Sequence, residues 1–565
     1  MLARFGFNHT VSSVHAAAII IGGAALASRL LGILRDRLLA SAFGAGRELD
    51  IYYAAFEIPD FMSVIFLLGA GSAAILPVFQ EYLYRDREDA WRLISGLVFF
   101  FCMGAVILLT AALVLAPQLV ALIVPGFDLQ DQEQTVLLTR LMLASPLLLG
   151  LSGIFSSIAQ SYQRFLAFSL APVMYNVGII AGIVFFVPLI GLEGLAWGVI
   201  VGAFLHLATQ VVAAWGVGFR LYLGRGFMIQ GVLRVAKLSF PRVLSLSLSH
   251  LTLLALVALG STLTAGSIAV FQLSRNLYFV PVGLFGISYS VVIFPRLNKS
   301  YLERDAASFF RDLYFGIRMV LLWLVPSAAL FLVLRAHIVR SALGAGSFSW
   351  EDTRLTAAAL AVFVFAMIGG GLLPLLIKAF YAIERTWAPF FITIGSSVLT
   401  VIIALWLTGV LSADESFLRN LVADVFRVAD LPSVAVLGLP IGFAAGMFVN
   451  AWFLSASLLK TAANIFGGRP KFPVSAVFKI IIASIIAGVV AYAVRVSFSE
   501  TIPLITFARV LFQGAAAGAA GVGVYIGVLM LLKSEDIASL RRSMEKRLWQ
   551  TGILPKSWDP GEPME

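Results

Sequence analysis

The chain has 565 residues, of which 60% are hydrophobic and only 12% are charged. Its mean hydropathy is +0.97, whereas about a quarter of the residues in an average soluble domain are charged. This balance excludes a soluble fold. The net charge of +10 does not indicate nucleic-acid binding, because the basic residues are spread over many loops and do not gather in one polar domain.

Apolar runs of about 20 residues, each long enough to span a bilayer, recur along the whole length. Backbone groups in lipid must be satisfied within each segment, so these runs predict helices. We therefore expect an all-α polytopic membrane protein with about fourteen transmembrane helices. The predicted spans are 15–43, 51–82, 92–124, 135–160, 168–189, 193–216, 238–263, 268–295, 308–334, 356–382, 388–411, 436–461, 474–497 and 505–532.

The apolar pattern of the first span continues past Arg29, which favours a retained helix over a cleaved signal peptide. Lys and Arg are concentrated in one set of alternate loops and in both termini. The positive-inside rule places that set in the cytoplasm, and an even number of helices agrees with two cytoplasmic termini. We expect a bacterial inner-membrane location.

Prolines and tyrosines recur at nearly one offset, which indicates two six-helix lobes in the same orientation. The pairs lie 217 to 219 residues apart and are Pro77 and Pro295, Tyr82 and Tyr301, Tyr162 and Tyr381, and Pro172 and Pro389. The predicted divisions are a cytoplasmic N-terminus (1–14), an N-lobe (15–225), a C-lobe (226–465), helices 13 and 14 (466–533) and a cytoplasmic amphipathic tail (534–565).

Two polar segments interrupt this pattern. Residues 412–435 form an outward loop in which Phe417, Leu421 and Val425 have the spacing of a short surface helix. From residue 534 onward, apolar side chains at helical spacing alternate with basic ones, which predicts an interfacial helix on the inner leaflet. A disordered basic tail is the alternative.

The first span contains Ser28, Arg29, Arg35, Asp36 and Arg37. An arginine near the bilayer centre costs about 2.5–3.5 kcal/mol on insertion scales, so these groups should face protein or a water-filled cavity. Positions seven apart share a helix face, so we expect Asp36 to neutralise Arg29 while Arg35 points elsewhere. The functional interpretation is that Arg29 and Arg35 bind an anion, since a guanidinium holds phosphate bidentately. The alternative is a structural Arg–Asp network. Arg37 lies near the outer end of the span and is not expected to bind substrate.

Other embedded polar residues are candidates for the same cavity. Asp50 is expected either to cap the second span or to act in gating or an ion pair, and Glu57 and Asp60 flank a proline deeper in that span. Arg275 and Asn276 lie in the eighth span. Lys378 is another embedded cation, which snorkelling explains equally well. The predicted substrate-binding residues are Ser28, Arg29, Arg35, Asp50, Asp60, Arg275, Asn276 and Lys378.

No motif indicates an enzyme. The chain has no phosphate-binding P-loop, no HExxH and no clustered metal ligands, and its five histidines are scattered. His206 is expected to be a packed core residue. We therefore predict a transporter with no catalytic residues, no metal and no cofactor.

The residues quoted above resemble the MurJ/MviN family of lipid II flippases, within the superfamily of multidrug and oligosaccharide-lipid exporters. The similarity is strongest over 27–82 and continues through 164–180, 194–210, 281–297 and 379–389. It implies two lobes around a cationic cavity that accepts an undecaprenyl-pyrophosphate-linked peptidoglycan precursor. It also implies rocking driven by membrane potential or a monovalent ion, and matches Arg29, Arg35 and Asp50 to the family's functional charges.

Two positions depart from the family pattern. Basic residues expected after the proline of the second span are replaced by Ser63 and Val64, and the expected arginine of the eighth span is one residue displaced, at Arg275. A flippase for another undecaprenyl-linked glycan, such as an O-antigen or capsule unit, therefore remains an alternative. Further alternatives are a membrane scaffold that recruits cell-wall synthesis proteins and a polyprenyl-using enzyme. Membrane lipids are the other expected partners.

Overall fold

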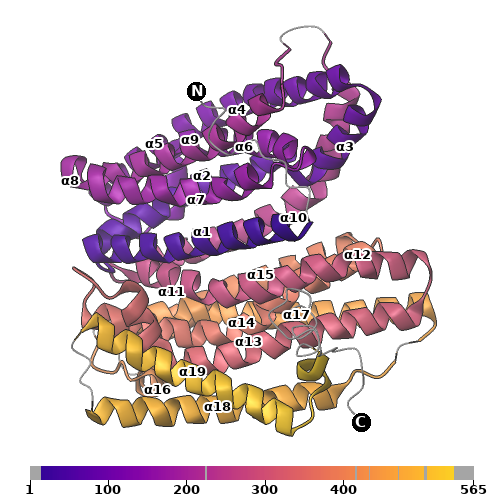
Figure 1. The fold of residues 1–565 in the computed structure, drawn as a ribbon. Coiled ribbons are helices and arrows are strands. Elements are labelled where there is room, and N and C mark those ends of the chain that lie inside the picture. The colour runs from indigo at the N-terminus through magenta and orange to yellow at the C-terminus, as the bar shows by residue number, and fades with distance from the viewer. Residues whose placement is uncertain are drawn as a thin grey trace. The chain divides into compact units, whose positions relative to one another are not determined.

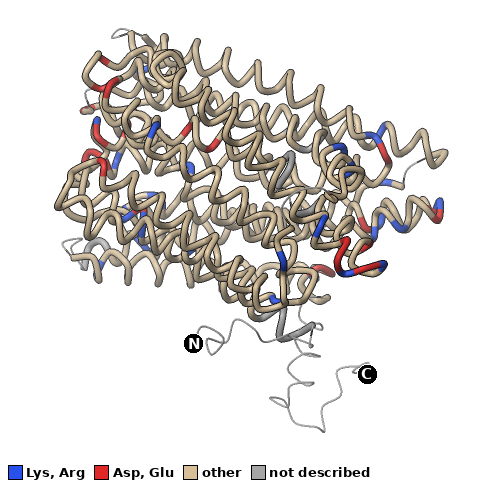
Figure 2. Tube along the Cα trace, turned by 90° about the horizontal axis from the view of Figure 1, so that it is seen from above, with Lys and Arg blue, Asp and Glu red and all other residues tan. Residues whose placement is uncertain are grey.

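The computed structural model describes residues 14–70, 72–222, 226–413, 416–431, 433–468, 470–501 and 506–539. Within these ranges the chain is almost entirely helical and has no β-strand (Figure 1). The prediction of an all-α membrane protein is therefore confirmed. Figure 2 shows Lys, Arg, Asp and Glu mostly towards the ends of helices, with long uncharged stretches between them.

The described residues up to 261 form ten α-helices and one π-helix. They are α1 (Val14–Phe43), α2 (Arg47–Ala70), α3 (Ser72–Arg85), α4 (Arg87–Ile123), α5 (Leu129–Met142), α6 (Ala144–Ser161), α7 (Phe165–Ala181), the π-helix η2 (Gly182–Phe186), α8 (Val187–Ile190), α9 (Glu193–Gly216) and α10 (Ile229–Ser261).

The remaining elements are α11 (Ser267–Pro281), the π-helix η3 (Val282–Ile287), α12 (Ser288–Leu302), α13 (Ala306–Leu343), α14 (Trp350–Ala382), α15 (Trp387–Ser412), α16 (Phe417–Phe426), the 3-10 helix η4 (Ala435–Leu437), α17 (Gly438–Phe466), α18 (Val474–Thr501) and α19 (Phe507–Leu531). Every predicted span coincides with one or more of these helices.

Eleven helical stretches in the described residues are long and apolar enough to cross a membrane. They coincide with eleven of the predicted spans. The other three predicted spans, 15–43, 51–82 and 238–263, are also helical, and their crossing of the membrane stays a prediction. The molecule is thus a multi-pass membrane protein.

The chain divides into two compact units that interleave along the sequence. The first comprises Met1–Leu273, Ala342–Thr356 and Thr393–Gly442, and the second comprises Ser274–Ser341, Ala357–Ile392 and Phe443–Glu565. The predicted lobes, with their boundary between residues 225 and 226, stay a prediction.

In the first unit, α7 packs on both α1 and α9. Glycines at four-residue spacing bring α7 and the start of η2 close to α9. A Cβ on Gly182, the first residue of η2, would lie 2.5 Å from the Cα of Gly198, and Gly178 on α7 meets Gly202 in the same way. Small residues at this spacing let transmembrane helices approach closely, where dispersion contacts and not the hydrophobic effect hold them together. This contact holds α7 in place, and α1 packs on α7.

In the second unit, two clusters form the interior. One packs α12, α13, α14 and α17 around Phe309, Phe310 and Phe380. The other packs α13 against α18 and α19, and the Tyr525 hydroxyl donates to the Leu322 carbonyl oxygen at 2.6 Å.

The two polar segments have different outcomes. The short surface helix predicted within 412–435 is confirmed as α16. Ile537, the first apolar residue of the predicted tail helix, is 8% exposed and packs in the cluster of α13, α18 and α19. Residues 540–565 of the predicted tail lie outside the described residues.

Candidate functional site

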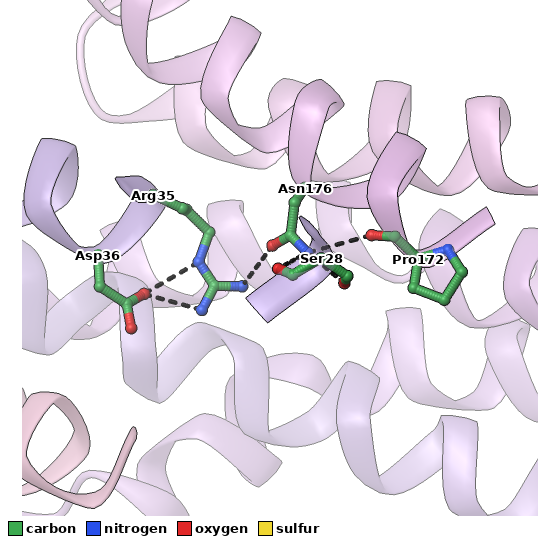
Figure 3. Close-up of polar contacts among 5 residues, drawn as sticks. All are labelled: Ser28, Arg35, Asp36, Pro172 and Asn176. Atoms are coloured by element: carbon green, nitrogen blue, oxygen red, sulfur yellow. Dashed lines mark hydrogen bonds and ion pairs between the residues drawn. The ribbon is translucent and has the colours of Figure 1, made fainter. Parts of the chain in front are cut away.

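The guanidinium of Arg35 is held inside the first unit by two polar neighbours (Figure 3). Its Nε and Nη2 donate to Asp36 Oδ1 at 3.0 and 2.8 Å, and its Nη1 donates to Asn176 Oδ1 at 3.4 Å. The Arg35 side chain is 24% exposed and that of Asp36 is 8% exposed. A charged pair in such surroundings is tolerated because each ion neutralises the other.

This geometry corrects one prediction. Helix geometry predicts that Arg35 points away from the face shared by Arg29 and Asp36, because it lies about 120° around the helix from Arg29. The structure instead pairs Arg35 with Asp36. The arginine side chain is long enough to turn along the helix and reach its neighbour, so Cα direction does not determine where its guanidinium lies. The proposed partnership of Arg29 with Asp36 stays a prediction.

Asn176 on α7 is a member of this site that the sequence did not single out. Its Nδ2 lies 3.3 Å from Ser28 Oγ, 3.4 Å from the Ser28 carbonyl oxygen and 3.1 Å from the Pro172 carbonyl oxygen (Figure 3). The sequence pattern that could have indicated Asn176 is an amide four residues after a proline, inside an otherwise apolar run. Such a side chain finds acceptors on the helix backbone and on the neighbouring helix.

Asn176 therefore joins two predicted site residues. Ser28 and Arg35 lie seven residues apart, which places them within about 20° of the same face of α1. The amide bridges them by accepting from Arg35 and donating to Ser28. The result is a polar network between α1 and α7 whose positive group is fixed from two sides.

Asp50 caps a helix other than its own. Its carboxylate is 1% exposed and accepts from the backbone N–H of Gly266 at 2.6 Å and of Ala269 at 2.8 Å. These are unsatisfied donors at the N-terminus of α11, where a negative charge is favourable. Asp50 therefore caps a helix, but the N–H groups that it accepts from belong to the start of α11 and not to its own helix, α2.

Three chain segments meet around this cap. Gly266 has a φ of +89° and lies directly against the carbonyl of Ala45, where no side chain would fit. Ser347 N–H donates to the Ser41 carbonyl oxygen at 2.9 Å, and Arg37 Nη2 reaches the Gly344 carbonyl oxygen at 3.4 Å. One end of the first unit is therefore closed by backbone contacts.

Glu57 and Asp60 on α2 have different surroundings. Glu57 is 6% exposed and accepts from Gln272 Nε2 at 3.0 Å. Asp60 lines a cavity of about 380 Å³ whose wall is completed by Ser63, Val64, Phe66, Leu149, Gly150, Gly153 and His250. Asp60 therefore has access to a small ligand or water, and its role in substrate binding stays a prediction.

The remaining predicted site residues are distributed over both units. Arg29 is half-buried on α1, whereas Arg275 and Asn276 on α11 and Lys378 on α14 are half-buried in the second unit. Their convergence on one cavity stays a prediction. His206, expected in the core, is half-buried and its Nδ1 lies 2.7 Å from Ser152 Oγ.

The long apolar helices and the guanidinium held among them define a polytopic α-helical membrane protein with an internal charged site. The family described as "Lipid II flippase MurJ" matches residues 39–513. This match extends over most of the chain, and the chain belongs to that family.

Individual relatives agree with this assignment. The "Lipid II flippase MurJ" of Burkholderia cenocepacia is 27% identical over 393 residues, which cover 68% of this chain and 76% of the relative. The "Probable lipid II flippase MurJ" of Rhizobium meliloti is 25% identical over 540 residues, covering 93% and 95%.

Solved structures show the same fold. A structure described as "Lipid II flippase MurJ, inward closed conformation" has a TM-score of 0.70 at 22% identity and covers 91% of this chain and 98% of its own. An inward-facing multidrug resistance transporter of the MATE family has a TM-score of 0.61 at 15% identity, covering 77% and 95%. At these identities the likeness concerns the fold alone.

Proposed function

We propose that this chain carries lipid II, the undecaprenyl-pyrophosphate-linked precursor of peptidoglycan, from the inner to the outer leaflet of the bacterial inner membrane. Membership of the flippase family supports the substrate class. The observation that carries the proposal is the guanidinium of Arg35, fixed between Asp36 and Asn176 in an apolar helical unit.

Arg35 retains capacity for an anion. A guanidinium has five N–H donors, and the hydrogen bonds of Arg35 in the described structure use three of them. The remaining donors suit pyrophosphate oxygens, which accept from the planar fork with fixed geometry. Arg29, seven residues before Asp36, would supply a second positive charge on the same helix.

Transport would proceed by alternating access and would leave the substrate chemically unchanged. The contact of Asp50 with the start of α11 keeps one end of the first unit closed. Release on that side requires this contact to open. The loop charges predict that both termini lie in the cytoplasm, and the closed end would then face outward.

Depletion of the native flippase in a bacterium that expresses this chain tests the proposal. We expect restored growth and lipid II at the outer surface of the membrane. Loss of rescue in Arg29→Ala and Arg35→Ala, at normal membrane levels of the variants, would support the anion site. Arg85→Ala is the matched control, because Arg85 pairs with the surface residue Glu81.

Two outcomes would contradict the proposal. Rescue that survives the double variant Arg29→Ala/Arg35→Ala would remove the anion-binding role from α1. Rescue of a strain that lacks an O-antigen or capsule flippase, without rescue of the lipid II defect, would assign a different undecaprenyl-linked glycan. The second comparison is needed because Ser63 and Val64 stand where the family pattern has basic residues.

A further inference from the structure

The short helix α16 exposes a stripe of large apolar side chains. Phe417, Leu421 and Val425 are 77%, 46% and 60% exposed. They lie at intervals of four residues, so they occupy one sector of the helix surface about 80° wide. Single exposed apolar residues are ordinary, but a contiguous stripe marks a surface that contacts something other than water.

The exposed face of α16 has a second, polar edge. Asn420 and Asp424 are also exposed, and their mean direction lies about 80° from that of the apolar stripe. The opposite side of the helix faces protein, where Ala423 is 5% exposed. The outward surface is thus divided lengthwise into an apolar and a polar half, as expected for a helix that lies along a boundary between lipid and water.

Neighbouring contacts in the first unit place α16 near the ends of two apolar helices. Arg354, in the second turn of α14, forms a bidentate pair with Asp430 and also donates to the Arg427 carbonyl oxygen just after α16. Hydrogen bonding from Arg354 lowers the pKa of Asp430 to about 2, so this pair remains charged at any physiological pH.

Two exposed tryptophans lie near these ends of α14 and α15. Trp350 begins α14 and is 53% exposed, and Trp406 lies in the last two turns of α15 and is 58% exposed. Tryptophan is enriched where a transmembrane helix passes from hydrocarbon into the headgroup region. Since α16 follows the end of α15 directly, it lies within reach of this boundary.

We propose that α16 is an interfacial helix that inserts Phe417, Leu421 and Val425 into the lipid surface while Asn420 and Asp424 stay in water. The distribution of basic residues among the loops predicts that this surface is the outer leaflet. The helix would hold the first turns of α14 at a constant depth through the Arg354–Asp430 pair. This inference stands independently of the transported substrate.

The charge of α16 defines the kind of lipid surface it fits. Its charged residues are Arg419 and Asp424, one of each sign. Basic interfacial helices bind through attraction to anionic lipids as well as through apolar burial. A helix without net charge depends on apolar burial alone, so its insertion should be the same in zwitterionic and anionic bilayers.

Spin labelling tests this proposal, because the chain has a single cysteine, Cys102. In a Cys102→Ala background, the full chain carries one label at Leu421→Cys, Val425→Cys, Asn420→Cys or Asp424→Cys, in nanodiscs of pure phosphatidylcholine. We expect labels at 421 and 425 to collide with oxygen at least several-fold more than with a water-soluble nickel chelate. Labels at 420 and 424 should show the reverse preference.

The lipid-facing position Val398→Cys on α15, 54% exposed, is the reference for a label within hydrocarbon. Nickel accessibility at all four positions of α16 would overturn the proposal and indicate a water-exposed surface for a protein partner. If the labels at 421 and 425 enter the lipid only after phosphatidylglycerol is added, the proposal that insertion does not depend on lipid charge is overturned. Elution of each variant at the native size confirms that the fold is retained.

Discussion

At the scale of single residues, one amide organises the charged face of α1. Asn176 receives a hydrogen bond from Arg35 and lies within bonding distance of Ser28, so it helps to orient the guanidinium. A preorganised group binds its ligand with a smaller entropic cost than a mobile one. Asn176 acts through Arg35 and is therefore a positioning residue.

We expect Asn176→Leu to weaken transport several-fold more than it lowers the amount of folded protein. A hydrogen bond to a charged group contributes about 1.5–3 kcal/mol, and its loss leaves Arg35 with Asp36 as its only partner among those described. The measurement is lipid II transport against substrate concentration in proteoliposomes. The apparent affinity should fall more than the maximal rate.

Gln210→Leu is the matched control, because the Gln210 amide also joins two helices of this unit, donating to the Ala167 carbonyl oxygen on α7 at 3.2 Å. It should lower thermal stability without changing the apparent affinity. Equal effects of both variants on affinity would show that Asn176 has only a structural role.

Asp50 connects α2 to the start of α11. In Asp50→Asn, one acceptor oxygen is replaced by a donor that faces backbone N–H groups, and loss of a cap costs about 0.5–2 kcal/mol. We expect this end of the unit to open more often. A cysteine at Ile268, which is 1% exposed, should then react faster with a membrane-impermeant maleimide.

The control for this experiment is Asp128→Asn. Asp128 caps its own helix, α5, by accepting from the Asp131 N–H at 2.8 Å. Asparagine is an equally good cap there, so labelling at residue 268 should not change. Unchanged labelling in Asp50→Asn as well would show that the capping bond does not keep this end closed.

At the scale of elements, the contact of α7 with α9 depends on the absence of side chains. Gly178 on α7 and Gly182 at the start of η2 meet Gly202 and Gly198 on α9. A single methyl group at this contact forces the helices apart, and overpacking of this kind costs about 1–3 kcal/mol. Because α1 packs on α7, we expect such a change to disturb the Arg35 network as well.

We expect Gly198→Ala to lower the midpoint of thermal unfolding by several degrees in detergent or nanodiscs. Gly104→Ala on α4 is the control, since a Cβ there meets nothing within 4 Å and alanine favours a helix by about 1 kcal/mol. Its midpoint should stay the same or rise. A Gly198→Ala protein as stable as the native one would mean that α7 and α9 can separate without cost.

At the scale of the whole molecule, the proposed function is the movement of an anionic headgroup through an apolar helical protein. Moving one elementary charge across 100 mV changes its free energy by about 2.3 kcal/mol. An inside-negative potential therefore favours outward movement of an anion. We propose the membrane potential, or a monovalent ion gradient, as the energy source.

We expect lipid II transport in proteoliposomes to rise with an inside-negative potassium diffusion potential set by valinomycin. Reversal of the potential should reduce the rate. A transport rate that does not depend on the potential but changes with an imposed sodium or proton gradient would assign the energy source to that ion. Independence from both would contradict this proposal.

The helices themselves could be predicted because their signal is local. A run of about 20 apolar residues has to form a helix in lipid, so α1 and α9 begin and end within one residue of the predicted spans. The surface helix α16 was also evident, because its apolar spacing interrupts an otherwise polar loop. Family membership followed from similar local patterns, above all those of 27–82.

Only the tertiary structure decided which polar groups meet. Helical periodicity predicts a pair of Asp36 with Arg29, which stays a prediction. It did not indicate that the flexible side chain of Arg35 reaches Asp36 and has its second partner 141 residues away, on α7. Asp50 likewise bonds to backbone N–H groups 216 and 219 residues further along. Periodicity gives the direction of a Cβ, whereas a hydrogen bond depends on side-chain length and on helix packing, which no local pattern contains.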